Sequence, residues 1–239
     1  MIQHIPLIIP YFMQPTYLKN AINWFHWYYP KNHIFILVNG FNSHGSEHVD
    51  MSDERIHYIP FNGNDCAGNL SLLLSNFPFE YYIISDPDIM PHPATPPCFL
   101  EVMKQAIDEH GFHRAGFNLI TSDIPDWLHK RDEIKYNEEC LRLKEEEIDY
   151  KSIVYKGFRA PLDTTFCLYK KSNGGWYAPM SGEDWSNCLR IFDAFHLQWY
   201  IHPDHVNDEM HKYYTNCQYR DLSPVSAGKN NNRPLKYMP

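Results

Sequence analysis

The chain has 239 residues, of which 44% are hydrophobic and 15% aromatic, enough to bury a large core in one domain with a short appended segment. Its 21 basic and 29 acidic residues give a formal net charge of -8, which argues against a protein that binds a nucleic-acid backbone. The six cysteines form no C-x-x-C pair, so neither a zinc knuckle nor a dense disulfide framework is indicated.

The N-terminal segment MIQHIPLIIPYF does not have the features of a secretion signal. Its apolar run is short, is broken by Pro6 and Pro10, and follows no basic region. No apolar stretch in the chain approaches the length of a membrane span. We therefore expect a cytoplasmic protein with reduced thiols and no transmembrane segment, at most in peripheral contact with a membrane.

The first half of the chain alternates apolar, strand-like runs with helix-like segments, which is the pattern of an α/β sheet with crossover helices. The apolar runs are continuous, as expected for strands that are covered on both faces. Ligands of such sheets lie beyond the carboxyl ends of the strands. The expected strands cover residues 4–10, 33–40, 55–62 and 80–88, and the expected helices cover residues 17–30 and 67–77.

The second half has a less regular pattern. The stretch 127–152 is highly charged and helical in pattern, and we interpret it as a solvated helical face. The other expected elements are a Pro-rich turn and helix at 91–111, strands at 113–123 and 160–171, a helix at 182–192, and a last strand or loop at 196–204.

Two acidic residues follow the fourth expected strand directly, in the segment YYIISDPDIMP. Mg²⁺ and Mn²⁺ prefer oxygen ligands and commonly take one or two protein carboxylates together with the phosphates of a substrate. Asp86 and Asp88 are placed for this role, and Pro87 restricts the backbone between them. A D-x-D tripeptide also arises from the preference of aspartate for turns, so its position at a strand end is what favours a cation site.

The order of the motifs resembles that of small GT-A fold glycosyltransferases, specifically the family 2-like enzymes of bacterial and viral type. The resemblance implies an α/β fold with a mostly parallel central sheet flanked by helices. It also implies one domain over 1–222, with a nucleotide-binding half at 1–90, an acceptor-site half at 91–222, and a loosely ordered tail at 223–239. The matching segments, which span most of residues 5–203, are IPLIIPYFMQPTYLKNAINWF, ILVNG, NGNDCAGNLSLLL, YYIISDPDIMP, APLDTTFCLYKK and FHLQWYIHP.

On the nucleotide side, the resemblance implies that Pro10 and Tyr11 lie by the base and that Asn39 hydrogen-bonds it. Asn64 and Gly68 would line the ribose and the phosphates. Each residue also has a simpler interpretation. Asn39 belongs to an ordinary strand-ending Asn-Gly turn, Tyr11 can be an aromatic at the edge of the core, and Gly68 can serve helix-start geometry. Their joint occurrence at successive strand ends is what favours binding.

On the metal side, the resemblance implies that Asp86 faces the ribose or the metal and that Asp88 binds the metal directly. His196, in FHLQWY, would reach the metal or the diphosphate, since GT-A enzymes commonly bring a C-terminal histidine there. A histidine beside aromatic residues can equally be a packed core residue. The expected cofactor is Mn²⁺ or Mg²⁺.

An inverting enzyme also needs a general base, because the acceptor hydroxyl must lose its proton as it attacks the anomeric carbon. Asp163 stands before an expected strand in APLDTTF, and Asp184 opens an expected helix in SGEDWSNCLR. Both have structural alternatives, since an aspartate at either place can cap a turn or a helix. We favour Asp163 and keep Asp184 as the alternative.

The sequence thus suggests a metal-dependent, inverting glycosyltransferase that moves a sugar from a UDP- or GDP-sugar to a glycan, a glycolipid or another hydroxyl acceptor, without a nucleic-acid partner. A retaining transferase would use the same donor site, and a non-catalytic carbohydrate-binding protein with a decayed fold is a further alternative. A nucleotidyltransferase is disfavoured, because the segment after the first strand, PYFMQPTYLK, lacks the glycines that hold a triphosphate.

Overall fold

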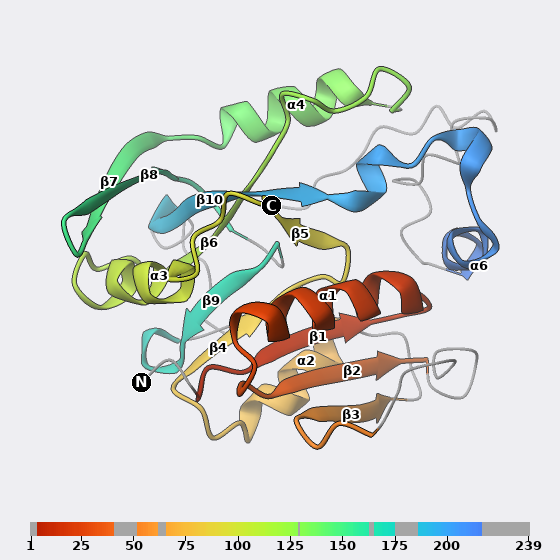
Figure 1. Ribbon diagram of the computed structural model, residues 1–239, viewed down its shortest axis with the longest axis horizontal. Helices are drawn as coiled ribbons and strands as arrows, with labels where there is room; N and C mark the ends of the chain where they lie inside the picture. Colours follow the sequence, from red (N-terminus) through yellow and green to blue (C-terminus); the bar gives the residue numbers. More distant parts are fainter. Residues whose placement is uncertain are drawn as a thin grey trace.

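The computed structural model describes residues 4–40, 52–61, 66–128, 130–162, 165–174 and 186–216. In these residues, ten strands form one sheet with the order β3-β2-β1-β4-β9-β6-β10-β8-β7, and β5 pairs with β10 (Figure 1). The strands are β1 Leu7–Tyr11, β2 Ile34–Asn39, β3 Ile56–Phe61, β4 Tyr81–Ile84, β5 Ile89–Pro91, β6 Arg114–Leu119, β7 Lys144–Tyr150, β8 Ile153–Arg159, β9 Cys167–Lys170 and β10 Cys188–His196. The α-helices are α1 Pro15–Tyr28, α2 Cys66–Ser75, α3 Phe99–Asp108, α4 Arg131–Cys140 and α6 Asp208–Asn216.

The α/β class is confirmed, and the sheet is mixed. Strands β3, β2, β1 and β4 are all parallel to one another. Strand β9 is antiparallel to both β4 and β6, so β4 and β6 run in the same direction, and β10 is parallel to β6. The carboxyl ends of β1, β2, β3, β4, β6 and β10 therefore lie along the same edge of the sheet. We call this the carboxyl edge.

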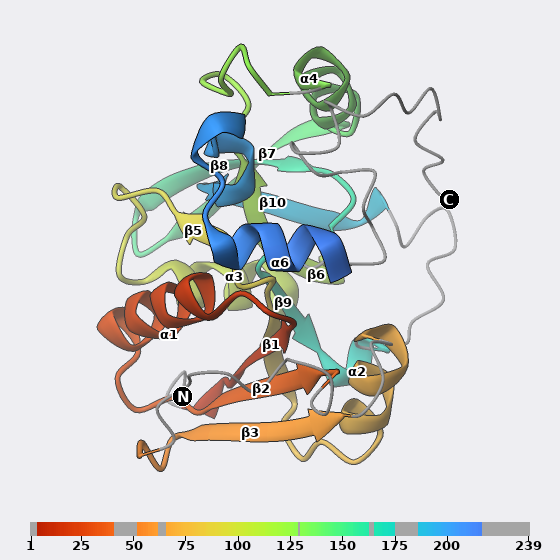
Figure 2. The ribbon, with the colours of Figure 1, turned by 90° about the vertical axis from the view of Figure 1, so that its right-hand side faces the viewer.

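Helices cover both faces of the sheet, which explains the continuous apolar runs of the first strands. On one face, α1 and α3 bury Phe25 and Phe99 in a cluster that includes Leu7 and Ile9 of β1. On the other face, α2 packs against a cluster that includes Ile8. Successive residues of β1 thus point to opposite cores, with α1 and α2 on opposite sides (Figure 1 and Figure 2).

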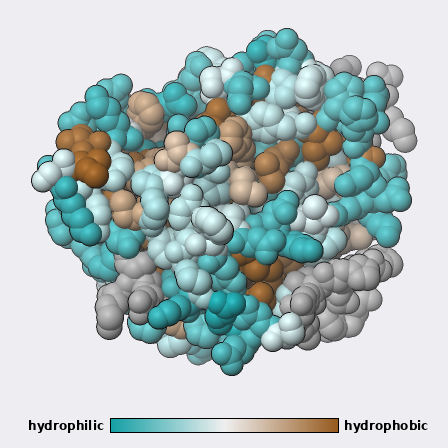
Figure 3. Space-filling model, viewed as in Figure 1, coloured by the Kyte–Doolittle hydropathy of each residue, from teal (hydrophilic) through white to brown (hydrophobic). Residues whose placement is uncertain are grey.

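The expected long helix over 127–152 is wrong beyond Cys140. Helix α4 ends there, and β7 and β8 form an antiparallel hairpin whose turn residues Lys151 and Ser152 have positive φ angles of 52° and 64°. Strand β7 is charged because it lies at the end of the sheet order, where charged side chains keep an edge strand from pairing with other chains. The hydrophobic patch at the left of Figure 3 lies over this hairpin, whose Ile153 and Val154 are exposed.

The expected helix at 182–192 is wrong over its last residues. Cys188 opens β10, a central strand whose side chains Leu189, Ile191 and Ala194 are buried. Helix α6 was not predicted, although Asn207 provides a signal for it. Its side-chain oxygen accepts a 2.9 Å hydrogen bond from the N–H of Met210, the usual arrangement at a helix start. None of the helices in the described ranges has both the length and the apolar character needed to cross a membrane.

Candidate functional site

The D-P-D turn lies at the carboxyl edge, between β4 and β5, and strand pairing brings it to β10. Strand β5 is antiparallel to β10, with Ile89 opposite His196. The backbone N–H of Leu197 donates a 2.8 Å hydrogen bond to the carbonyl oxygen of Asp88. Backbone contacts on both sides thus hold Asp88 next to His196, although the two residues are far apart in the sequence.

The side chains of Asp88 and His196 face each other. His196 Nδ1 lies 3.5 Å from Asp88 Oδ2, with the aspartate side chain 4% and the imidazole 23% exposed. Among the described residues, this buried Nδ1 has no hydrogen-bond partner. The imidazole stacks on Trp199, with centroids 4.9 Å apart and an interplanar angle of 4°, which fixes its plane. A buried, unpartnered nitrogen beside a carboxylate fits a pair of ligands to a cation.

The pair fits an ion that arrives with its substrate better than a closed metal site. In the described part of the chain, no group of three His, Cys, Asp or Glu side chains could hold a metal ion. The half-buried Asp86 therefore does not complete a three-residue site with Asp88 and His196. Mg²⁺ sites often use one or two carboxylates, substrate phosphates and water, which matches the two residues present.

Tyr17 lies within electrostatic reach of both Asp88 and Glu209, and neither Tyr17 nor Glu209 was expected from the sequence. Burial, together with the negative charges of Asp88 and Glu209, raises the pKa of Tyr17 to about 12. Glu209, from α6, accepts hydrogen bonds from the backbone N–H of Thr16 at 3.0 Å and from its hydroxyl at 2.5 Å. An acidic side chain thus neutralises the first turn of α1 and fixes α6 beside the site.

The expected base-binding residues lie together at the ends of β1 and β2. The side-chain amide of Asn39 donates to the carbonyl oxygens of Tyr11, at 3.3 Å, and Leu37, at 3.2 Å. Its oxygen accepts a 2.6 Å hydrogen bond from Asn69 of α2. Tyr11 and Asn39 are 1% and 0% exposed, so both side chains are buried beneath the carboxyl ends of β1 and β2. Asn69, which was not predicted, is the half-buried amide above them.

The remaining predicted residues are Pro10, Gly68, Asn64, Asp163 and Asp184. Pro10 is half-buried in β1, and Gly68 is exposed in the first turn of α2. Asn64, Asp163 and Asp184 lie outside the described residues. Their roles stay predictions.

Comparisons with known proteins show likeness in structure and none in sequence: no protein-family model and no curated protein matches the chain. A mannosyltransferase from Pyrobaculum calidifontis, in complex with GDP-Man and Mn²⁺, is 11% identical with a TM-score of 0.49 over 96% of this chain. The chain spans 65% of that protein's length. An inositol-1-phosphate CTP transferase from T. maritima is 13% identical with a TM-score of 0.43, over 88% of this chain and 94% of that one. Likeness of this degree assigns no residue role to this chain.

Proposed function

We propose that this chain is a metal-dependent glycosyltransferase of the GT-A type, which moves a sugar from a UDP- or GDP-sugar to a hydroxyl group of a glycan or glycolipid. The observation that carries the proposal is the pair of Asp88 and His196, with its unpartnered imidazole nitrogen, at the carboxyl edge of an α/β sheet. Ligands of open α/β sheets bind beyond this edge. The ends of β1 and β2 and the start of α2 meet there too.

In this proposal Asp88 and His196 hold the cation, and Asp86 faces the ribose or the cation. A divalent cation bound there supplies positive charge for a diphosphate leaving group, which a chain of net charge -8 otherwise lacks. Trp199 keeps the imidazole plane fixed through stacking. Glu209 and α6 would form the wall of the donor site beside Tyr17.

The strand topology favours Asp163 as the general base. Strand β9, which begins four residues after Asp163, pairs antiparallel with β4, with Cys167 opposite Ile84. Strand β9 therefore starts at the edge where β4 ends, two residues before Asp86. We therefore propose Asp163, four residues before this start in the sequence, as the general base. In the proposed inverting reaction it takes the proton of the acceptor hydroxyl while that oxygen attacks the anomeric carbon and the bond to the diphosphate breaks.

Asp184 has less support for this role. It precedes β10, whose first residue, Cys188, pairs with Arg114 at the far edge of the sheet. From Cys188 to His196 the strand covers about 26 Å at about 3.3 Å per residue. The start of β10 therefore lies far from Asp88 and His196, and the pairing of this strand gives no support to Asp184 as the base.

A thermal-shift panel tests the proposed function. It compares UDP-, GDP-, CMP- and dTDP-sugars with and without Mn²⁺. A ligand at about 100 times its Kd adds about 2.7 kcal/mol, or a rise in Tm of about 5–10 °C for a domain of this size. We expect one nucleotide class to give this rise only with the metal. Stabilisation by free sugar, with no effect of any nucleotide sugar and metal, would instead identify a non-catalytic carbohydrate-binding protein.

The role of His196 can be tested with two variants. His196→Phe keeps a ring to stack on Trp199 but removes the nitrogen that faces Asp88, whereas His196→Ala removes both. We expect both variants to lose turnover and only the alanine variant to lose Tm. The loss should be larger with Mn²⁺ than with Mg²⁺, because imidazole suits the softer ion. Normal turnover of His196→Phe with both metals would show that the histidine is a packing residue.

A further inference from the structure

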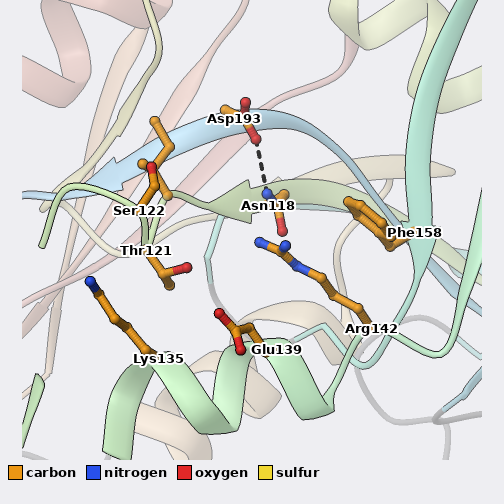
Figure 4. A pocket seen from close by; sticks show the side chains of 9 residues that line it. Asn118, Thr121, Ser122, Lys135, Glu139, Arg142, Phe158 and Asp193 are labelled. Atoms are coloured by element: carbon orange, nitrogen blue, oxygen red, sulfur yellow. Dashed lines mark hydrogen bonds between the residues drawn. The ribbon is translucent and has the colours of Figure 1, made fainter. Parts of the chain in front are cut away.

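A second pocket opens on the carboxyl edge, in the half of the chain beyond β4. It has a volume of about 400 Å³ and lies between α4 and the ends of β6 and β10 (Figure 4). This volume falls at the small end of the range for ligand sites, which is roughly 300–1,000 Å³. Its main lining side chains are Asn118, Asp193, Lys135, Glu139, Arg142 and Phe158.

Two buried polar atoms of the pocket have no hydrogen-bond partner among the described residues. They are Oδ1 of Asn118 and Nε of Arg142. Asn118 is 7% exposed, and its amide nitrogen donates a 2.9 Å hydrogen bond to Asp193, which directs the oxygen toward the α4 side of the pocket (Figure 4). The Arg142 guanidinium lies 4.9 Å from the centroid of the Phe158 ring. One unpaired acceptor and one unpaired donor therefore line the same small space, and buried groups of this kind call for a ligand or water.

Residues outside the lining of the pocket hold its walls in place. Glu138 of α4 forms an ion pair with Arg190 of β10, whose side chain is 6% exposed. Arg190 also donates a 2.8 Å hydrogen bond to the carbonyl oxygen of Pro161. Helix α4 has no fully buried residue, and this ion pair is one of the contacts that join it to the sheet. Lys135 and Glu139, on adjacent turns of α4, thereby face the ends of β6 and β10.

The chemistry of the lining fits a neutral, hydroxyl-rich ligand. Lys135 and Arg142 are balanced by Glu139 and Asp193, so the pocket offers no excess positive charge for a phosphate. Each hydroxyl group can donate and accept a hydrogen bond, which suits a lining with both donors and acceptors. Phe158 and Ile120 add apolar surface, against which the C–H face of a sugar ring can pack.

The pocket also lies near the proposed donor site. Strand β6 is two strands away from β4 in the sheet, which corresponds to about 10 Å, and both strands end at the carboxyl edge. On β10, Asp193 and His196 are three residues apart, again about 10 Å. A sugar chain of two or three rings could therefore extend from the pocket to the donor site.

We propose that this pocket is a saccharide-binding site that holds a neutral sugar unit. Sugar binding there does not depend on the proposed function. Only its further role, as the subsite that positions the acceptor for transfer, rests on glycosyl transfer by this chain.

Saturation-transfer NMR of the full chain in EDTA, without nucleotide, tests the proposal. The probes are glucose, galactose, mannose, N-acetylglucosamine and maltose, with inorganic phosphate as a competitor. We expect at least one sugar to bind with a Kd on the order of 1 mM, without displacement by phosphate. Absence of binding by all five sugars, or displacement by phosphate, would overturn the proposal.

Matched variants on exposed positions locate the binding. Glu139→Ala removes a lining carboxylate, and Glu133→Ala removes one from the same helix outside the pocket. Only the first should weaken sugar binding, by about tenfold or more for the loss of one charged hydrogen bond. Equal effects of the two variants would refute the assignment. Asp88→Asn should leave sugar binding unchanged, so a failed donor site and a failed saccharide site give different results.

If the pocket positions the acceptor, Glu139→Ala will raise the KM for the acceptor in a transfer assay and leave the KM for the nucleotide sugar unchanged. A rise in both would argue for a general loss of structure, which the Tm of the variant would reveal.

Discussion

Asp88→Asn should weaken metal-dependent binding of the nucleotide sugar by more than about 100-fold, because loss of a residue that only supports a metal ligand already costs about 10–100-fold. The Asp88 carboxylate is almost fully buried and faces His196, so no other described acidic residue can take its place in the pair. The substitution keeps the shape of the side chain and the backbone bond from Leu197 to Asp88. Calorimetry with and without Mn²⁺ measures the effect.

Two controls accompany this experiment. Asp86→Asn should weaken binding less, since Asp86 is half-buried and does not join the pair. Asp204→Asn should have no effect, because that side chain is 85% exposed. Unchanged affinity and unchanged metal dependence in Asp88→Asn would remove the central claim of the proposed function.

Asp163→Asn should keep donor binding and reduce transfer by a factor of roughly 100–10,000, the usual contribution of a general base. It is chosen because it stands four residues before β9 in the sequence, and β9 begins opposite Ile84, at the end of β4. Donor affinity by calorimetry and single-turnover transfer rates separate the two effects. Retained transfer together with normal donor binding would exclude Asp163 as the base.

The matched variant is Asp184→Asn, which should keep both donor binding and transfer. If this variant is folded but inactive while Asp163→Asn is active, the two roles must be exchanged.

The sequence by itself determined the α/β character of the first half. Continuous apolar runs separated by amphipathic segments can be satisfied only when each strand is covered on both faces, and β1 is covered in this way by α1 and α2. The position of the D-P-D turn could also be predicted from the sequence, because two carboxylates that directly follow a buried strand must lie at the edge of the sheet. Strand β7 could not be predicted, because a charged edge strand with little buried surface has no apolar pattern in its sequence.

The tertiary structure decided which polar groups meet. His196 faces Asp88 because β5 pairs with β10, and a pairing between distant segments leaves no local trace in either one. The contact of Glu209 of α6 with the start of α1 also joins segments that are distant in the sequence. The pocket beneath α4 has walls from four separate elements. Local sequence sets periodicity, burial and turns, whereas the register between distant strands follows from the packing of the whole sheet. Asp86, Asp88 and His196 were therefore visible in the sequence as candidates, whereas the meeting of Asp88 with His196 and the whole second pocket became visible only in the fold.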